Sequence, residues 1–152
     1  MKLPFPRPPL LIGLAGLAPF AYGALSAQIP AIASDFAPPL MVLEIYGPML
    51  FAFLSGAFWG FASGSSRVSG RAGWRWLGLA AAPAALLFVA TIVEPGEIVS
   101  LLLFGFPALL AIDFLFWRAK LAPRWWLPLR VLLTALATAC LWLALNGVGE
   151  AL

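Results

Sequence analysis

Apolar residues dominate five long runs of this chain, and short stretches rich in glycine, proline or polar residues separate the runs. Each run is close to the roughly 20 residues that an α-helix needs to cross the hydrocarbon core of a bilayer. The pattern therefore predicts an all-α fold, a polytopic membrane helix bundle of about five transmembrane helices. The predicted helices cover residues 9–28, 40–62, 74–93, 98–117 and 125–145, and residues 1–152 form a single integral membrane domain.

The composition excludes water as the main solvent of this chain. Hydrophobic residues make up 63% of the 152 residues and charged residues only 10%, whereas roughly a quarter of the residues in soluble domains are charged. At about 20 residues for each span, this length holds five or at most six spans and almost nothing else. We expect the first run to remain as an uncleaved helix, although the basic residues before it resemble a secretory signal.

Charged residues change sign from one predicted loop to the next. All nine basic residues precede the first run or lie in or beside the loops between runs two and three and between runs four and five. By the positive-inside rule, this bias predicts an N-terminus in the cytoplasm and a C-terminus outside. Topology thus accounts for the basic residues without a nucleic-acid partner. The basic residues are Lys2, Arg7, Arg67, Arg71, Arg75, Arg118, Lys120, Arg124 and Arg130, and the acidic residues of the opposite side are Asp35, Glu94, Glu97 and Glu150.

Tryptophans and arginines gather at the ends of the runs on the basic side. Tryptophan rings favour the level of the lipid headgroups, and arginines attract anionic headgroups. The loop from Gly64 to Arg67 offers backbone amides beside an arginine, and we expect an anionic lipid headgroup as its ligand. The lipid bilayer is therefore the predicted partner of this face. The predicted interfacial or lipid-binding residues are Trp59, Arg67, Arg71, Arg75, Trp125 and Trp126.

Each run contains a proline within it, which predicts kinked helices. A proline inside a helix removes a hydrogen bond, and in a membrane bundle neighbouring helices can satisfy the freed carbonyl. The kinks either improve packing or open a central cavity. The prolines are Pro19, Pro48, Pro83, Pro107 and Pro128.

Small residues form a stripe on the second predicted helix. Gly56, Gly60 and Gly64 stand four residues apart and share one helix face. Such a double GxxxG pattern lets another helix backbone approach closely. We expect this face to pack against a helix of the same chain, and the alternative is a helix of another protein.

Ionisable residues inside the runs are the main candidates for a functional site. Asp113 comes about one turn before the basic end of the fourth run, and Arg130 lies at a similar depth in the fifth run. Because an unpaired charge in the membrane is costly, we expect an ion pair between them, with Thr134 as a further hydrogen-bond partner. The pair either fixes the two helices or relays protons or ions.

A second set of polar residues could mark a path through the bilayer. Glu44 lies near the outer end of the second run and close to Tyr46, and Thr134 lies in the fifth run. A polar path past these side chains is one hypothesis. The alternative is that the Glu44 side chain reaches the outer interface.

Cofactor chemistry finds little support in this sequence. The chain has no histidine and one cysteine, Cys140, inside an apolar run. This excludes histidine-ligated haem, a His/Cys zinc site and an internal disulfide. We expect no cofactor and no metal site, and we expect that the protein is not an enzyme, because catalysis needs paired titratable groups.

Several segments point to a known family. Ala15 to Phe20, Phe53 to Gly60 and Trp125 to Arg130, together with Asp113, closely resemble the transmembrane protein 69-like family, which carries a domain of unknown function. The resemblance covers nearly the whole chain. It implies a multi-pass protein of the bacterial cytoplasmic (inner) membrane without an assigned activity. It also implies that Asp113, Trp59 and Arg130 belong to the framework of the family.

Two functions remain after these exclusions. A well-developed packing surface without evident chemistry favours an accessory, assembly or scaffold component of a larger inner-membrane protein complex. The alternative is a small transporter or proton-coupled carrier that uses the intramembrane residues Glu44 and Asp113.

Overall fold

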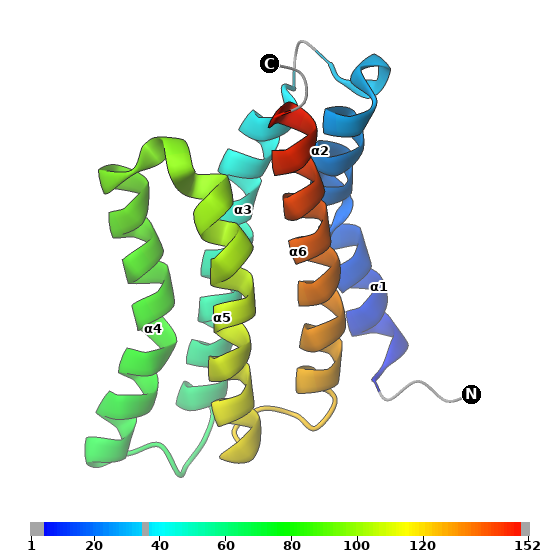
Figure 1. The fold of residues 1–152 in the computed structure, drawn as a ribbon. Coiled ribbons are helices and arrows are strands. Elements are labelled where there is room, and N and C mark those ends of the chain that lie inside the picture. The colour runs from blue at the N-terminus through cyan, green and yellow to red at the C-terminus, as the bar shows by residue number, and fades with distance from the viewer. Residues whose placement is uncertain (1–4, 35–36, 150–152) are drawn as a thin grey trace.

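The computed structural model describes residues 5–34 and 37–149 of the chain. The helices run side by side as one antiparallel bundle (Figure 1). Five helical segments are long and apolar enough to cross a membrane, and the described residues contain no β-strand. The predicted all-α membrane bundle is therefore confirmed. The elements are α1 (Arg7–Gly16), α2 (Ala18–Gln28), the short 3-10 helix η1 (Pro30–Ile32), α3 (Pro39–Ser63), α4 (Gly70–Val93), the 3-10 helix η2 (Pro95–Glu97), α5 (Ile98–Arg118) and α6 (Trp126–Gly149).

The first span is broken in the middle, at Leu17 between α1 and α2. Pro19 explains the break, because its ring lacks an N–H group and collides with the preceding helical turn. The break leaves the Gly16 carbonyl available to a neighbouring helix, and the Tyr46 hydroxyl of α3 donates a hydrogen bond to it at 2.9 Å. A side chain of the adjacent span thus satisfies the interrupted backbone, as the membrane interior requires.

The other prolines leave their helices continuous. Helices α3, α4 and α5 run through Pro48, Pro83 and Pro107 without an interruption. The sequence predicted that Pro128 lies well inside its helix. That prediction is wrong, because α6 begins at Trp126. A proline in the first turn displaces no helical hydrogen bond, since the N–H groups there have no partner in the helix.

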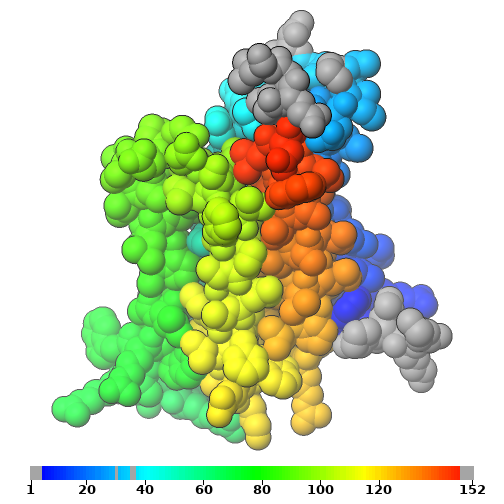
Figure 2. Space-filling model, in the orientation of Figure 1, coloured from blue at the N-terminus to red at the C-terminus, as the bar shows by residue number. Residues whose placement is uncertain are grey.

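Phenylalanines fill the centre of the bundle. Phe20, Phe58, Phe106 and Phe116 are completely or almost completely buried. Phe106 packs edge-on against Phe20 with ring centres 5.7 Å apart, which joins α2 to α5. On the periphery, α4 lies at one edge of the bundle, and Figure 2 shows the furrow that separates α4 from α5. The outer surfaces of the helices carry large exposed apolar side chains, as expected for a lipid-facing surface.

The two loops with basic residues meet at one end of the bundle. The α3–α4 and α5–α6 connections lie at the same end as the start of α1, and the α4–α5 connection lies at the opposite end (Figure 1). The loops with basic residues thus share one end of the bundle, as the charge pattern predicted. Lys2, Asp35 and Glu150 lie outside the described residues.

Candidate functional site: a buried Asp-Trp-Arg cluster and the groove beside it

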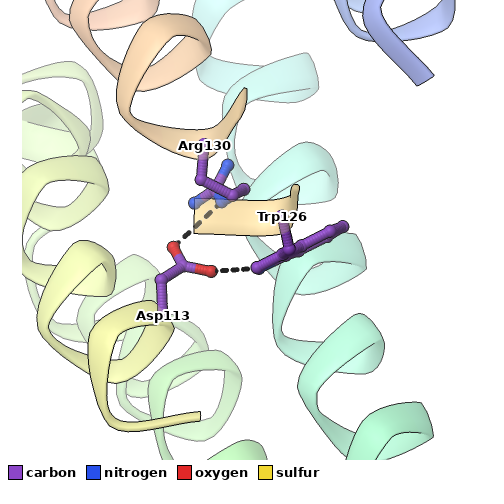
Figure 3. Close-up of polar contacts among 3 residues, drawn as sticks. All are labelled: Asp113, Trp126 and Arg130. Carbon is purple, nitrogen blue, oxygen red and sulfur yellow. Dashed lines mark hydrogen bonds and ion pairs between the residues drawn. The ribbon is translucent and has the colours of Figure 1, made fainter. Parts of the chain in front are cut away.

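Asp113, Trp126 and Arg130 form a buried polar cluster near the end of α5 and the start of α6 (Figure 3). Arg130 Nε lies 3.0 Å from Asp113 Oδ2, and this contact is both a hydrogen bond and an ion pair. The indole N–H of Trp126 donates a hydrogen bond to the other carboxylate oxygen, Oδ1. Asp113 has no exposed surface and Arg130 is 4% exposed. The structure thus brings together the two charges that the sequence predicted as a pair.

Helix periodicity explains why α6 supplies two partners for one carboxylate. Trp126 and Arg130 are four residues apart and therefore lie on the same face of α6. The short connection after Arg118 turns α6 back along α5, which sets this face against Asp113. The sequence pattern predicted Trp126 at the lipid interface and did not indicate this contact. The spacing of four residues between Trp126 and Arg130 was the signal that could have revealed it.

The cluster is electrically balanced but leaves hydrogen-bonding capacity unused. Carboxylate and guanidinium cancel in charge, which removes most of the cost of placing either one in the membrane. Arg130 Nη2 is buried and has no hydrogen-bond partner among the described residues. The Thr134 hydroxyl, one turn further along α6, is also buried and unpartnered there. The structure therefore contradicts the expected role of Thr134 as a hydrogen-bond partner within the cluster.

Replacing Trp126 by Phe should lower the free energy of unfolding by about 1.5 kcal/mol, because a hydrogen bond to a charged group is lost. Arg130 still compensates the carboxylate, so the bundle should still fold. The measurement is unfolding in mixed detergent micelles with increasing sodium dodecyl sulfate. Trp125→Phe is the matched control, since its half-buried indole has no hydrogen bond to the described residues, whereas that of Trp126 donates one to Asp113. Equal losses in the two variants would contradict a specific role for the Trp126 hydrogen bond.

An apolar groove lies beside the cluster, between α1, α3 and α6. Its volume is about 390 Å³. Arg130 and Thr134 belong to its wall, and its rim carries the exposed side chains of Ile12, Met49 and Phe53. The groove therefore opens sideways to the lipid. Its remaining lining residues are Gly13, Gly16, Leu17, Tyr46, Leu50, Leu54, Phe106, Trp126, Leu129, Leu133 and Ala137.

The three residues of the predicted polar path do not share one site. Tyr46 and Thr134 both line the groove, but the Tyr46 hydroxyl donates its hydrogen bond to Gly16. Glu44 is exposed on α3 and does not belong to the groove wall. The predicted path past all three is therefore wrong. Residues 44 and 46 are only two apart, so helix geometry directs their side chains to different sides of α3.

The predicted packing face of α3 is open. Gly56 and Gly60 are exposed, and a Cβ atom built on either one would meet nothing within 4 Å. At Gly64 the nearest atom is the Gly60 carbonyl oxygen of the same helix, 3.1 Å away. The expectation that this face packs against another helix of the same chain is therefore wrong for Gly56 and Gly60. Helix α3 buries the opposite face, which carries Leu54, Phe58 and other large side chains.

A shallow polar hollow lies at the end of the bundle that carries the basic loops. Gly60, Gly64, Ser65, Ser66 and Arg67 line one side of it, and Lys120 of the α5–α6 connection lines the other. The loop from Gly64 to Arg67 was predicted to bind a lipid headgroup, and the structure adds Lys120 to its surroundings. Among the other predicted interfacial residues, Arg71, Arg75 and Trp59 are exposed and Trp125 is half-buried.

The described residues offer no metal site. Among residues 5–34 and 37–149, no group of three or more histidine, cysteine, aspartate or glutamate side chains could hold a metal ion. Cys140 is a free, half-buried thiol in α6.

The five apolar spans define a multi-pass integral membrane protein. The chain belongs to the family described as "Protein of unknown function (DUF3429)", whose family model matches residues 5–146. It is similar to Transmembrane protein 69 of Xenopus tropicalis, with 29% identity over 135 residues. That match covers 87% of this chain and 51% of the relative, so the chain spans about half the length of the curated relative. No solved structure is significantly similar to the chain.

Proposed function

We propose that this protein is a non-enzymatic accessory, assembly or scaffold component of a larger protein complex in the bacterial cytoplasmic membrane. The observation that carries the proposal is the open glycine face of α3. Gly56 and Gly60 expose backbone on the lipid side of a membrane-spanning helix, with no helix of this chain against them. A face of this kind lets the backbone of another helix approach closely and gain dispersion contacts.

A transmembrane helix of another protein is the occupant that fits this face. The glycines lie within a membrane span, where only a segment with an internally satisfied backbone is stable. Trp59 flanks the glycines and is 48% exposed, so it would form a wall of the contact. The face carries no charge among these residues, so a partner helix with small apolar residues complements it.

The buried cluster supports a structural role in the same way. Both carboxylate oxygens of Asp113 already accept a hydrogen bond, one from Trp126 and one from Arg130. A carboxylate that is engaged in this way holds α5 against α6, and proton relay would require it to exchange partners. This arrangement favours an accessory role over a proton-coupled carrier.

Affinity purification of the tagged protein in mild detergent tests the proposal. We expect a partner at constant stoichiometry with the wild-type chain, and about tenfold less of it with Gly60→Leu, since a bulky side chain separates the two backbones. Ala111→Leu is the matched control, because Ala111 is exposed on α5, away from the glycine face. Repeated recovery of the chain alone, from membranes where it is expressed at its native level, would contradict the proposal.

A further inference from the structure

The groove between α1, α3 and α6 combines an apolar wall with two unused hydrogen-bond donors. Arg130 Nη2 and the Thr134 hydroxyl are both buried and unpartnered in the described part of the chain, and both residues line the groove. Arg130 is 4% and Thr134 is 3% exposed. A buried donor without a partner costs free energy, so these two groups favour a ligand that brings an acceptor. Such a ligand is separate from the partner helix proposed for the glycine face of α3.

The broken first span creates the groove. Helix α2 packs tightly on α6 near the outer end, where a Cβ atom on Gly147 would lie 2.7 Å from the Ala27 carbonyl oxygen. On the N-terminal side of the break at Leu17, α1 contains no buried residue and makes few contacts with α6. Helix α1 approaches α6 at Gly13, where a Cβ atom would lie 2.4 Å from Leu133 Cδ1. The groove lies beside this contact, between α1, α3 and α6. Lipid has direct access to this space, because Ile12 and Met49 on its rim are 74% and 64% exposed.

We propose that this groove binds a membrane glycerophospholipid, with one acyl chain along the apolar wall and its ester carbonyl accepting hydrogen bonds from Arg130 and Thr134. The depth of Arg130 supports this class of ligand. Helix α6 has 24 residues, so at about 1.5 Å per residue it extends roughly 3 Å beyond each side of a hydrocarbon core of about 30 Å. Arg130 is four residues, or about 6 Å, from the start of α6, which places it just inside the core edge, where lipid ester groups lie.

Charge also favours a neutral acceptor within the groove and an anion outside it. Asp113 already neutralises Arg130, so a free carboxylate in the groove would be an uncompensated charge. An ester carbonyl carries no charge and accepts the same hydrogen bonds. Arg7 begins α1 and Arg124 precedes α6, and both side chains are exposed at the cytoplasmic end of the two helices. They are available to the phosphate of the same lipid.

Photocrosslinking in nanodiscs tests this proposal. The probe is phosphatidylglycerol with a diazirine in one acyl chain, mixed at increasing mole fraction into phosphatidylcholine. We expect saturable labelling of residues 12–17 and 129–137. Thr134→Val should raise the half-saturating mole fraction of the probe about threefold to tenfold, because one hydrogen bond is lost and the side chain keeps its shape. Thr138→Val is the matched control, since its hydroxyl is also unpartnered but does not line the groove.

A second pair of variants tests the space itself. Met49→Trp places a larger side chain on the rim of the groove and should abolish saturable labelling. Met41→Trp changes an exposed residue of the same helix outside the groove and should not.

Parallel labelling experiments replace the phospholipid probe by a diazirine-labelled isoprenoid quinone or a diazirine-labelled fatty acid. The proposal is overturned if labelling rises linearly and equally on all spans, if Thr134→Val and Thr138→Val behave alike, or if only the quinone or the fatty acid saturates.

Discussion

Asp113→Ala should lower the free energy of unfolding by about 3 to 5 kcal/mol, because it leaves the Arg130 guanidinium buried without a counter-charge. Arg130 is 4% exposed, and its ion pair with Asp113 is the one found among the described residues. The substitution also deprives the Trp126 indole of its acceptor. The loss should appear as earlier unfolding in sodium dodecyl sulfate and as a lower melting temperature in detergent.

Two controls separate the charge effect from the loss of volume. The double variant Asp113→Leu with Arg130→Met removes both charges and should recover most of the lost stability, since an apolar pair often replaces a buried ion pair without cost. Glu44→Ala removes an exposed carboxylate on α3 and should change stability by less than about 0.5 kcal/mol. A double variant as unstable as Asp113→Ala would show that the ion pair is not what holds α5 to α6.

The same residue distinguishes the proposed accessory role from transport. In reconstituted vesicles, Asp113→Asn should leave proton and ion permeability at the level of empty vesicles, as for the wild-type chain. A wild-type flux that this variant abolishes would overturn the accessory role and support a carrier.

Gly147→Val should lower the free energy of unfolding by about 2 to 3 kcal/mol, because overpacking forces two helix backbones apart. A Cβ atom at Gly147 would lie 2.7 Å from the Ala27 carbonyl oxygen and 2.6 Å from Gln28 Nε2. The Ala27 oxygen belongs to the backbone of α2, so it cannot rotate away as a flexible side chain could. The shift would also disturb the hydrogen bond of 2.9 Å from Gln28 Nε2 to the Leu143 carbonyl.

Gly56→Val provides the matched comparison for Gly147→Val. Both substitutions add the same side chain to a glycine in a membrane-spanning helix, but a Cβ at Gly56 meets nothing within 4 Å. Its effect on stability should stay within about 0.5 kcal/mol. Equal destabilisation by the two variants, measured by detergent unfolding, would mean that helix propensity and not the contact of α2 with α6 determines the result.

These expected effects fit a bundle in which the internal helix faces stabilise the fold and the glycine face of α3 is free for a partner. The α2–α6 and α5–α6 contacts use a glycine, a buried ion pair and a tryptophan hydrogen bond to fix the fold. Gly56 and Gly60 of α3 contribute nothing to this internal packing. Substitution of Gly60 should therefore affect association with a partner and leave the fold of the isolated chain intact.

The sequence by itself determined the class of the fold and which loops share one end of the bundle. Apolar runs of about 20 residues specify membrane-spanning helices, because lipid requires every backbone polar group to be satisfied within the helix. Sorting of arginine and lysine among the loops predicted that the α3–α4 and α5–α6 connections share one end of the bundle. The pairing of Asp113 with Arg130 also followed from sequence, since the two residues lie at equal depth on either side of a short connection.

Only the tertiary structure decided which helix faces meet. Every face of these helices is largely apolar, so the pattern that distinguishes core from surface in a soluble protein is absent. Gly56 and Gly60 of α3 and Gly147 of α6 look alike in sequence, yet the first two face lipid and the third contacts α2. The break at Leu17, the Tyr46 hydrogen bond that stabilises it and the groove it opens toward Arg130 depend on contacts between residues far apart in the chain.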